Sequence, residues 1–292
     1  MKDEPEATYH PHPSRPKLKL PPGAWDTHCH VFGPKAIYPV DPNWPVRADA
    51  PKEKLFALHE MLGIERCVIV HSALHGLDNR VVEDALAGKG GAYLGVALLA
   101  PSVAPAELKR LDRAGFRGVR YNFMQHLKKE ATIDEVMDLA PRLADVGWHL
   151  QVHMERGMIA QVGPRLVKAP VPIVIDHIGR IDAGEGFDQV PFSALMRMME
   201  SGNAWCKVSG CDRITRAGPP YADAVPFAAR LMAEFPDRVV WGTDWPHPNH
   251  QGPVPDDGEL VDLIGAVAPT SAALSRLMVD NPRRLYDERG QG

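Results

Sequence analysis

The sequence lacks the features that mark membrane proteins, nucleic-acid-binding proteins and disulfide-stabilised proteins. No apolar run approaches the roughly 18 residues that a membrane span needs. A formal net charge of −4 and an isoelectric point near 6.3 provide no basic surface for nucleic acid or anionic lipid. The four cysteines form no CxxC pair, which favours reduced thiols. We therefore expect a cytoplasmic globular protein that binds neither nucleic acid nor membranes.

A Gly-rich phosphate turn, of the kind that opens a doubly wound α/β sheet, is also missing. What the sequence does contain is an alternation of β-rich runs and amphipathic segments with helical spacing. The runs are apolar on both faces, as strands of parallel sheets are. They lie at 24–30, 66–72, 93–99, 118–123, 148–154, 173–178, 204–210 and 238–244. Eight strand–helix units predict the α/β fold of a (β/α)8 TIM barrel.

The chain is predicted to form a single domain with an N-terminal extension. Residues 1–23, "MKDEPEATYHPHPSRPKLKLPPG", are polar and rich in proline, so we expect an extended arm with a solvated HPH tripeptide rather than a signal peptide. Residues 24–292 form the predicted barrel, because neither a linker nor a short repeat interrupts 24–286.

Ionisable side chains gather at the carboxyl-terminal ends of the predicted strands, where the loops of a TIM barrel build the active site. His28 and His30 end the first run two residues apart, so both point to one face. A lone strand histidine is usually a buried, hydrogen-bonded residue. Many polar groups that converge in an apolar barrel must instead satisfy one another or bind a ligand. The later runs carry or end in His71, Arg120, His153, Asp176, His177 and Asp244.

The motifs at these positions resemble a known family. "DTHCH" at 26–30, His153, "DHIGR" at 176–180 and "GTDWPHPN" at 242–249 are similar to motifs of the amidohydrolase superfamily. In that family an HxH pair, two later strand-end histidines and a strand-8 aspartate surround one or two divalent metals and a water. Within it, "HCHVFGP", "IVIDHIGR" and "WGTDWPHPN" resemble the branch of the 2-pyrone-4,6-dicarboxylate lactonases and 4-sulfomuconolactone hydrolases. The resemblance covers residues 24 to about 286.

The resemblance implies a metal site with an open position for water, made of His28, His30, His153 and Asp244. Three imidazoles and one carboxylate match a catalytic zinc site. The pyrone-dicarboxylate lactonases are thought to work without metal and carry a tyrosine in place of His153, so the histidine here restores a ligand. Tyr121 and Asn122 stand where binuclear members bridge two ions. We therefore expect one divalent metal, zinc. In the alternative interpretation, His153 only hydrogen-bonds the substrate.

Arg120, Arg180 and Arg213 follow or end predicted strands at the same rim. An isolated arginine usually forms a surface ion pair, but three beside an imidazole cluster suggest an anion receptor, because guanidinium groups bind carboxylate or sulfonate oxygens two at a time. The pyrone-dicarboxylate lactonases are similar at these positions but add an arginine where this chain has His126, which implies a different anion contact. Together with His153, this difference favours 4-sulfomuconolactone as the substrate.

These residues and the resemblance predict a carboxylic-ester hydrolase that opens a small, unsaturated anionic lactone. A metal-bound water attacks the ring carbonyl, Asp244 is the general base, and His177 stabilises the oxyanion. For 4-sulfomuconolactone, the resemblance implies release of sulfite and formation of maleylacetate in bacterial degradation of aromatic sulfonates. The alternatives are a metal-free 2-pyrone-4,6-dicarboxylate lactonase, a related aromatic-acid decarboxylase, and a binding protein of the same fold that has lost catalysis.

The loop "HSALHGLDN" at 71–79 offers a second kind of chemistry, because Ser72 and His75 invite a nucleophile–base interpretation. Nothing in the sequence defines a triad there. We take Ser72 and His75 as substrate contacts, with a structural loop role as the alternative. Asn249 is predicted to line the pocket. We expect exposed or core roles for three other histidines, His59, His149 and His250.

Overall fold

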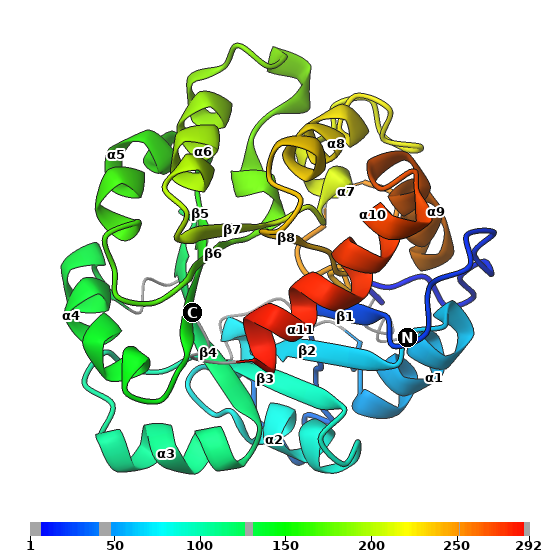
Figure 1. Ribbon diagram of the computed structural model, residues 1–292. Coiled ribbons are helices and arrows are strands. Elements are labelled where there is room, and N and C mark those ends of the chain that lie inside the picture. Colours follow the sequence, from blue (N-terminus) through cyan, green and yellow to red (C-terminus); the bar gives the residue numbers. More distant parts are fainter. Residues whose placement is uncertain (1–6, 41–47, 126–130, 251, 289–292) are drawn as a thin grey trace.

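The computed structural model describes residues 7–40, 48–125, 131–250 and 252–288. Eight parallel strands form one sheet, in which each strand pairs with the next along the chain. Helices lie between successive strands and surround the sheet (Figure 1). The predicted TIM barrel is therefore confirmed. No helix of the described ranges is both long and apolar enough to cross a membrane.

Each strand lies within or overlaps its predicted β-rich run, but β4 begins two residues earlier than expected, and β2, β3, β6, β7 and β8 end two to four residues earlier. They are β1 (Trp25–Cys29), β2 (Arg66–Val70), β3 (Tyr93–Ala97), β4 (Phe116–Phe123), β5 (His149–Met154), β6 (Ile173–Ile175), β7 (Ala204–Lys207) and β8 (Val239–Val240). The helices of the first half are α1 (Lys52–Leu62), α2 (Arg80–Ala87), α3 (Pro105–Arg113), α4 (Ile133–Ala144) and α5 (Arg156–Leu166). The second half contributes α6 (Val190–Glu200), α7 (Cys211–Ile214), α8 (Val225–Glu234), α9 (Asp257–Val267), α10 (Ser271–Ser275) and α11 (Asn281–Tyr286).

The strand β8 is shorter than the predicted run because the chain leaves the extended conformation at Asp244, whose φ is 61°. The segment after β8 nevertheless closes the barrel against β1. The Asp244 amide donates to the His28 carbonyl over 2.7 Å, and the His30 amide donates to the Trp245 carbonyl over 2.7 Å. Barrel closure thus places the "DTHCH" and "GTDWP" motifs side by side.

A buried carboxylate, Asp26, reinforces this closure. Its oxygens accept hydrogen bonds from the Thr243 hydroxyl over 2.6 Å and from the His28 amide over 2.9 Å. His59 Nε2 lies 3.2 Å from the same carboxylate. Burial lowers the pKa of His59, but its hydrogen bonds to Asp26 and Cys29 outweigh burial and raise the pKa to about 9. His59 is therefore a charged core residue, which is one of the two roles expected for it.

An apolar cluster fills part of the inside of the barrel, at the end that helix α11 covers. Helix α11 closes the apolar end, and in Figure 1 it crosses the barrel in red. Tyr286 from α11 is fully buried and stacks on Trp25 of β1, with 6.1 Å between ring centroids. The other members of this inner cluster are Val68, Val70, Leu94, Val96, Val174, Trp205, Val240 and Leu285.

The N-terminal arm is docked on the barrel in its described part, which begins at residue 7. The Ser14 amide and hydroxyl donate to Asp256, and the amides of Lys17 and Leu18 donate to one oxygen of Asp262. The described residues 7–23 contain neither helix nor strand. These contacts join the arm to the N-terminal half of α9.

Gly242 tests the closure between β1 and β8. A Cβ atom at this position would lie 2.4 Å from the His28 backbone nitrogen and 2.7 Å from an Asp26 oxygen. We expect Gly242→Ala to lower the free energy of unfolding by about 1–3 kcal/mol, because backbone atoms cannot move away as a flexible side chain can. Urea denaturation measures this. The control is Gly157→Ala in α5, where a Cβ meets nothing within 4 Å. Equal urea midpoints for the two variants would contradict the close approach.

Candidate active site

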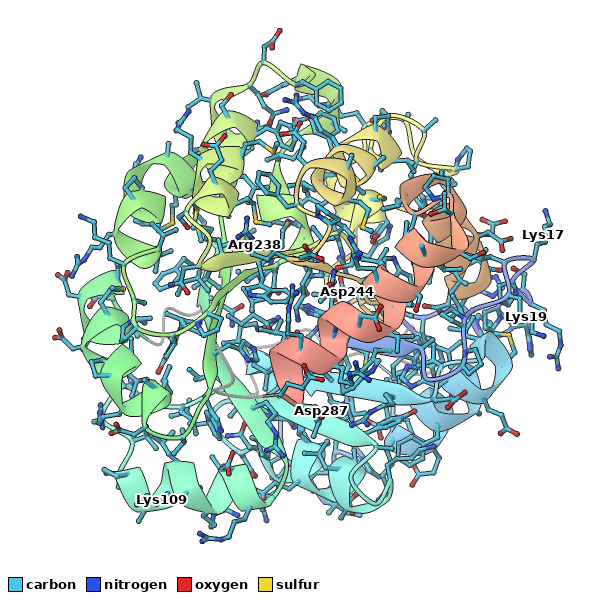
Figure 2. All side chains as sticks on the ribbon, in the orientation of Figure 1. Lys17, Lys19, Lys109, Arg238, Asp244 and Asp287 are labelled. Carbon is cyan, nitrogen blue, oxygen red and sulfur yellow. The ribbon has the colours of Figure 1, made fainter. Side chains whose placement is uncertain are left out.

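Three imidazoles surround one carboxylate oxygen at the carboxyl-terminal mouth of the barrel. Asp244 Oδ1 lies 3.3 Å from His30 Nε2, 3.6 Å from His28 Nε2 and 3.7 Å from His177 Nε2. All four side chains are buried. Figure 2 shows Asp244 near the centre of the barrel, whereas the labelled lysines lie at its periphery. The predicted convergence of strand-end groups is therefore present in the fold.

Left-handed backbone conformations turn several of these side chains into the mouth. The φ angles are 48° at His177, 55° at Arg180 and 61° at Asp244. Such angles cost a non-glycine residue about 1–3 kcal/mol and gather at functional sites. Gly210 gives His177 its space, because a Cβ there would lie 2.7 Å from the His177 Cβ atom. The turns after β6, β7 and β8 are thus shaped around the imidazole cluster.

Arg213 orients Asp244. Its Nε and Nη2 atoms lie 2.8 Å and 2.6 Å from Asp244 Oδ2, so Oδ1 is left to face the histidines. Burial would raise the pKa of Asp244, but the charge of Arg213 and the nearby histidines hold it well below its usual range. The carboxylate is therefore ionised. Arg213 was expected to bind substrate, and in this arrangement its guanidinium group is engaged by the carboxylate.

The geometry fits a divalent metal at part of the predicted ligand set. One donor atom each from His28, His30 and Asp244 lies within 4.8 Å of the other two. His28 Nε2 is buried without a hydrogen-bond partner. His30 Nδ1 lies 2.6 Å from the Val70 carbonyl, which can only accept, so its proton is on Nδ1 and the Nε2 lone pair points to the site. Burial lowers the pKa of both histidines, which keeps them neutral as ligands must be.

His153 lies outside this three-ligand group as found among the described residues. Its Nδ1 atom is 3.3 Å from the Asn122 side-chain oxygen, and its ring centroid is 5.7 Å from that of His177. Its Nε2 atom is buried without a hydrogen-bond partner. The imidazole therefore offers one free nitrogen beside His177, at a place suited to substrate as much as to a metal.

Two charged residues lie beneath the histidines: Lys207, which was not among the candidates from the sequence, and Asp176, which was noted there only as a strand-end residue. Lys207 of β7 donates to the Thr27 carbonyl over 2.8 Å and to Gln151 Oε1 over 3.0 Å, and it lies 3.2 Å from His28 Nδ1. Burial lowers the pKa of Lys207 to about 8, although Asp176 opposes this change. The signal that could have revealed it is a lone lysine in the otherwise apolar run 204–208.

Asp176 is the second of these residues and the counter-ion of the barrel interior. Its Oδ1 atom lies 3.3 Å from His28 Nδ1 and 3.8 Å from Lys207 Nζ, and its Oδ2 atom lies 3.7 Å from Arg120 Nη1. Arg120 also donates to the His71 carbonyl over 3.3 Å. The predicted substrate-binding residue Arg120 is therefore partly neutralised by Asp176 and sits deep in the barrel.

Arg180 is the predicted anion-binding residue with the most available charge. Arg180 lines a cavity at the rim of the barrel together with Arg156 and Arg216, and both of these arginines form ion pairs with Asp182. Among the described residues, no carboxylate lies within ion-pair distance of Arg180. Burial and the neighbouring Arg213 lower the pKa of Arg180. The cavity has a volume of about 230 Å³, and its lining includes Met124, Glu155, Arg180, Arg213, Ile214 and Thr215.

The loop after β2 is held by its own hydrogen bonds. Ser72 accepts from the Leu74 amide over 3.3 Å and caps a short 3-10 turn, Ala73–His75. His75 Nδ1 lies 3.0 Å from the Pro39 carbonyl, and its Nε2 accepts from the Gly33 amide over 3.4 Å. Both ring nitrogens are therefore engaged by backbone, which favours the structural alternative for this loop.

Two further candidates are placed less directly. Asn249 lies in the loop after β8 with a φ of 57°. His126 lies outside the described residues. His149 is buried inside the barrel, and His250 pairs with Asp212 over 3.4 Å. The expectation of core or exposed roles for His149 and His250 agrees with these positions.

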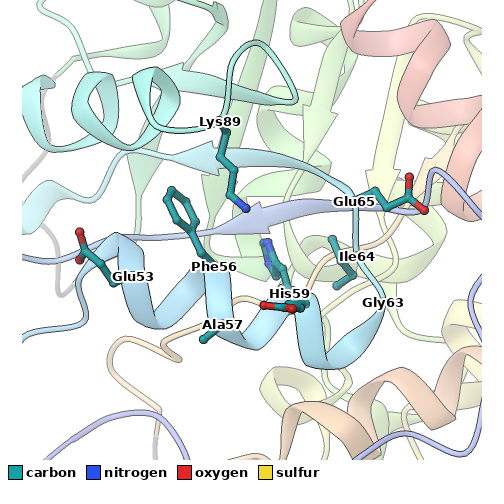
Figure 3. A pocket seen from close by; sticks show the side chains of 9 residues that line it. Glu53, Phe56, Ala57, His59, Gly63, Ile64, Glu65 and Lys89 are labelled. Atoms are coloured by element: carbon teal, nitrogen blue, oxygen red, sulfur yellow. The ribbon is translucent and has the colours of Figure 1, made fainter.

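A second cluster of possible metal ligands and a second cavity lie away from the mouth of the barrel. Cys29, His59 and Cys67 also come within ligand distance, but both nitrogens of His59 are engaged, by Asp26 and by the Tyr93 hydroxyl. All four cysteines are free, as expected, and all four are buried. A cavity of about 700 Å³ lies beside α1, where Figure 3 shows Lys89 near Phe56. It faces the turns at the amino-terminal ends of β2 and β3, opposite the catalytic end of a TIM barrel.

Fold and site define a (β/α)8 barrel whose mouth holds an HxH pair and a strand-8 aspartate. A family model described as amidohydrolase matches residues 25–287. The chain belongs to the amidohydrolase family, and the predicted family membership is confirmed.

Individual relatives and a solved structure give a more specific comparison than the family model does. The chain is 44% identical to a 2-pyrone-4,6-dicarboxylate hydrolase of Comamonas testosteroni, over 95% of this chain and 94% of the relative. It is 38% identical to a 4-sulfomuconolactone hydrolase of Rhizobium radiobacter, over 91% of each chain. The apo crystal structure of an Agrobacterium tumefaciens protein superposes with a TM-score of 0.82 at 30% identity, covering 93% of this chain and 98% of that one. The expected branch is thus the one in which the named relatives lie.

Proposed function

We propose that this protein is a hydrolase that opens the ring of a small, unsaturated lactone bearing acidic groups. The observation that carries the proposal is the ionised Asp244 carboxylate, with one oxygen held by Arg213 and the other facing three imidazoles. Two relatives with lactone substrates in their names support the same reaction class. Arg180 at the rim supplies positive charge for the acid groups of such a substrate.

One divalent ion, zinc, would be held by His28, His30 and Asp244, with His153 as a further ligand if its side chain moves toward them. When bound, such an ion lowers the pKa of a water and polarises an ester carbonyl. The described donor set of two neutral imidazoles and one carboxylate, with an orphaned His28 Nε2 atom, supports zinc among the divalent metals.

The residues of the chain perform the proton transfers. Asp244 Oδ1 accepts the proton of the attacking water and returns it to the leaving ring oxygen. Burial lowers the pKa of His177 to about 4, so this imidazole is neutral. The Ser209 hydroxyl lies 3.3 Å from His177 Nδ1 and can donate or accept, whereas Asp244 Oδ1, which only accepts, lies 3.7 Å from Nε2 and favours the proton on Nε2. His177 thus presents an N–H group that stabilises the oxyanion of the opening lactone.

Different observations favour different lactones as the substrate. His153 and the absence of an arginine at position 126 favour 4-sulfomuconolactone, which would yield maleylacetate and sulfite. The higher identity to the pyrone-dicarboxylate hydrolase favours 2-pyrone-4,6-dicarboxylate instead. We retain 4-sulfomuconolactone as the first candidate and the pyrone dicarboxylate as the second.

Turnover of the two lactones, before and after chelation, tests the proposal. We expect ring opening of 4-sulfomuconolactone by protein that contains about one zinc per chain, loss of activity on chelation, and recovery when zinc is added back. Metal analysis and absorbance assays measure these quantities. If the chelated protein kept full activity, a role of the metal in the reaction would be excluded. Hydrolysis of the pyrone dicarboxylate alone would reverse the order of substrates, and hydrolysis of neither would refute the function.

Asp244→Asn tests the general base. We expect kcat to fall by about 10³-fold while substrate binding is largely kept, since an amide cannot accept the proton of water. Steady-state kinetics and a binding titration measure the two effects. The matched control is Asp212→Asn, because Asp212 contacts Arg213 at 3.3 Å but pairs with His250 rather than with His28, His30 or His177. A variant at 244 with unchanged kcat would exclude the proposed role.

Arg180→Met tests the anion contact. We expect KM to rise by about 10- to 100-fold with a smaller change in kcat, because a hydrogen bond to a charged group contributes about 1.5–3 kcal/mol. The control is Arg156→Met, which removes an arginine of the same cavity that is already paired with Asp182 and Glu185. If the two variants have equal KM values, Arg180 is not the anion receptor.

A further inference from the structure

Lys207 lies inside the barrel beneath His28, and the reaction proposed above does not use it. Its side chain is fully buried. An ammonium group carries three hydrogens and no lone pair. Three acceptors surround this one, namely the Thr27 carbonyl at 2.8 Å, Gln151 Oε1 at 3.0 Å and His28 Nδ1 at 3.2 Å. Each hydrogen has its own acceptor as long as His28 Nδ1 carries no proton.

A neutral imidazole has one proton, so this arrangement places the proton of His28 on Nε2, the atom that faces Asp244 Oδ1 at 3.6 Å. The other tautomer would point an Nδ1–H group at Asp176 Oδ1, 3.3 Å away. It would also set N–H against N–H at Lys207 and leave a buried charged donor without an acceptor, which is unfavourable inside a protein. When His28 carries its proton on Nε2, Asp176 Oδ1 receives no hydrogen bond from His28. This loss is smaller than that of Lys207 in the other tautomer, because Gln151 Nε2 already donates to Asp176 Oδ1 over 2.7 Å.

We propose that Lys207 is a positioning residue that holds His28 as the Nε2–H tautomer and so opposes a divalent ion at His28, His30 and Asp244. This inference rests on the proposed metal site. A metal needs the Nε2 lone pair, so the proton must move from Nε2 to Nδ1, where Asp176 accepts it in a hydrogen bond. The number of protons on the ring is unchanged. Lys207 then directs its third hydrogen to Asp176, which lies 3.8 Å away.

The two histidines of the HxH pair are therefore held in different tautomers. His30 Nδ1 faces the Val70 carbonyl, an acceptor only, so His30 is held in the metal-binding tautomer. His28 Nδ1 faces a donor, Lys207, and an acceptor, Asp176, at distances that differ by 0.1 Å (3.2 Å against 3.3 Å). The competition between these two residues sets how much of the protein is ready to bind metal.

Nitrogen NMR of the zinc-free protein tests the tautomer directly. In long-range ¹H–¹⁵N spectra of histidine-labelled protein, we expect His28 as Nε2–H in the wild type and as Nδ1–H in Lys207→Met. The signals are assigned by their loss in His28→Gln. A wild-type His28 protonated at Nδ1 overturns the proposal. The wild-type spectrum alone decides this, so the test stands even if the variant does not fold.

Zinc affinity, measured by chelator competition, is the second readout. We expect Lys207→Met to bind zinc about tenfold more tightly than the wild type and Asp176→Asn to bind it more weakly, in the range of changes caused by residues behind metal ligands. Charge alone predicts the same directions, so the NMR tautomer takes precedence. Equal zinc affinities of wild type and Lys207→Met would overturn the effect on metal. If neither protein binds zinc, the proposed metal site fails, while the spectra still decide the role of Lys207.

Discussion

The arrangement of the site depends on how one carboxylate is held. Asp244 receives Arg213 on one oxygen, presents the other oxygen to His28, His30 and His177, and donates its backbone amide to the His28 carbonyl. A buried carboxylate without such partners would be neutral, because burial disfavours charge. The backbone amide of the same residue helps to close the barrel between its first and last strands. The geometry of the candidate site and the closure of the barrel therefore depend on the same residue.

Below this carboxylate, the barrel interior contains buried charges that compensate one another. Asp176 lies among Arg120, Lys207 and His28, and Gln151 connects the lysine to the carboxylate through its amide. Buried ion pairs contribute little net stability compared with apolar packing, but removing one partner is strongly destabilising. Their position directly behind the HxH pair gives them a second effect, since they determine which nitrogen of His28 carries a proton.

The strand positions and most of the site could be predicted from the sequence because each rests on a short-range pattern. Runs of β-branched residues mark strands, and the strand-end rule of TIM barrels places their last polar residues together. Arg120, Arg213 and Lys207 show where this reasoning ends. Spacing along a strand indicates that an arginine reaches the mouth, but only the packed barrel shows which carboxylate it meets. Lys207 was overlooked because a single lysine in an apolar run carries no periodic signal.

The sequence by itself determined the barrel, the family and the set of polar residues that face its mouth, since local periodicity and motif spacing are properties of the chain. Only the tertiary structure decided which of these residues pair with each other and which keep their charge. Arg180 has no carboxylate within ion-pair distance among the described residues, whereas Arg213 is paired with Asp244. The physical reason is that ion pairs and tautomers depend on distances of a few ångströms between residues far apart in the chain, and folding alone sets those distances.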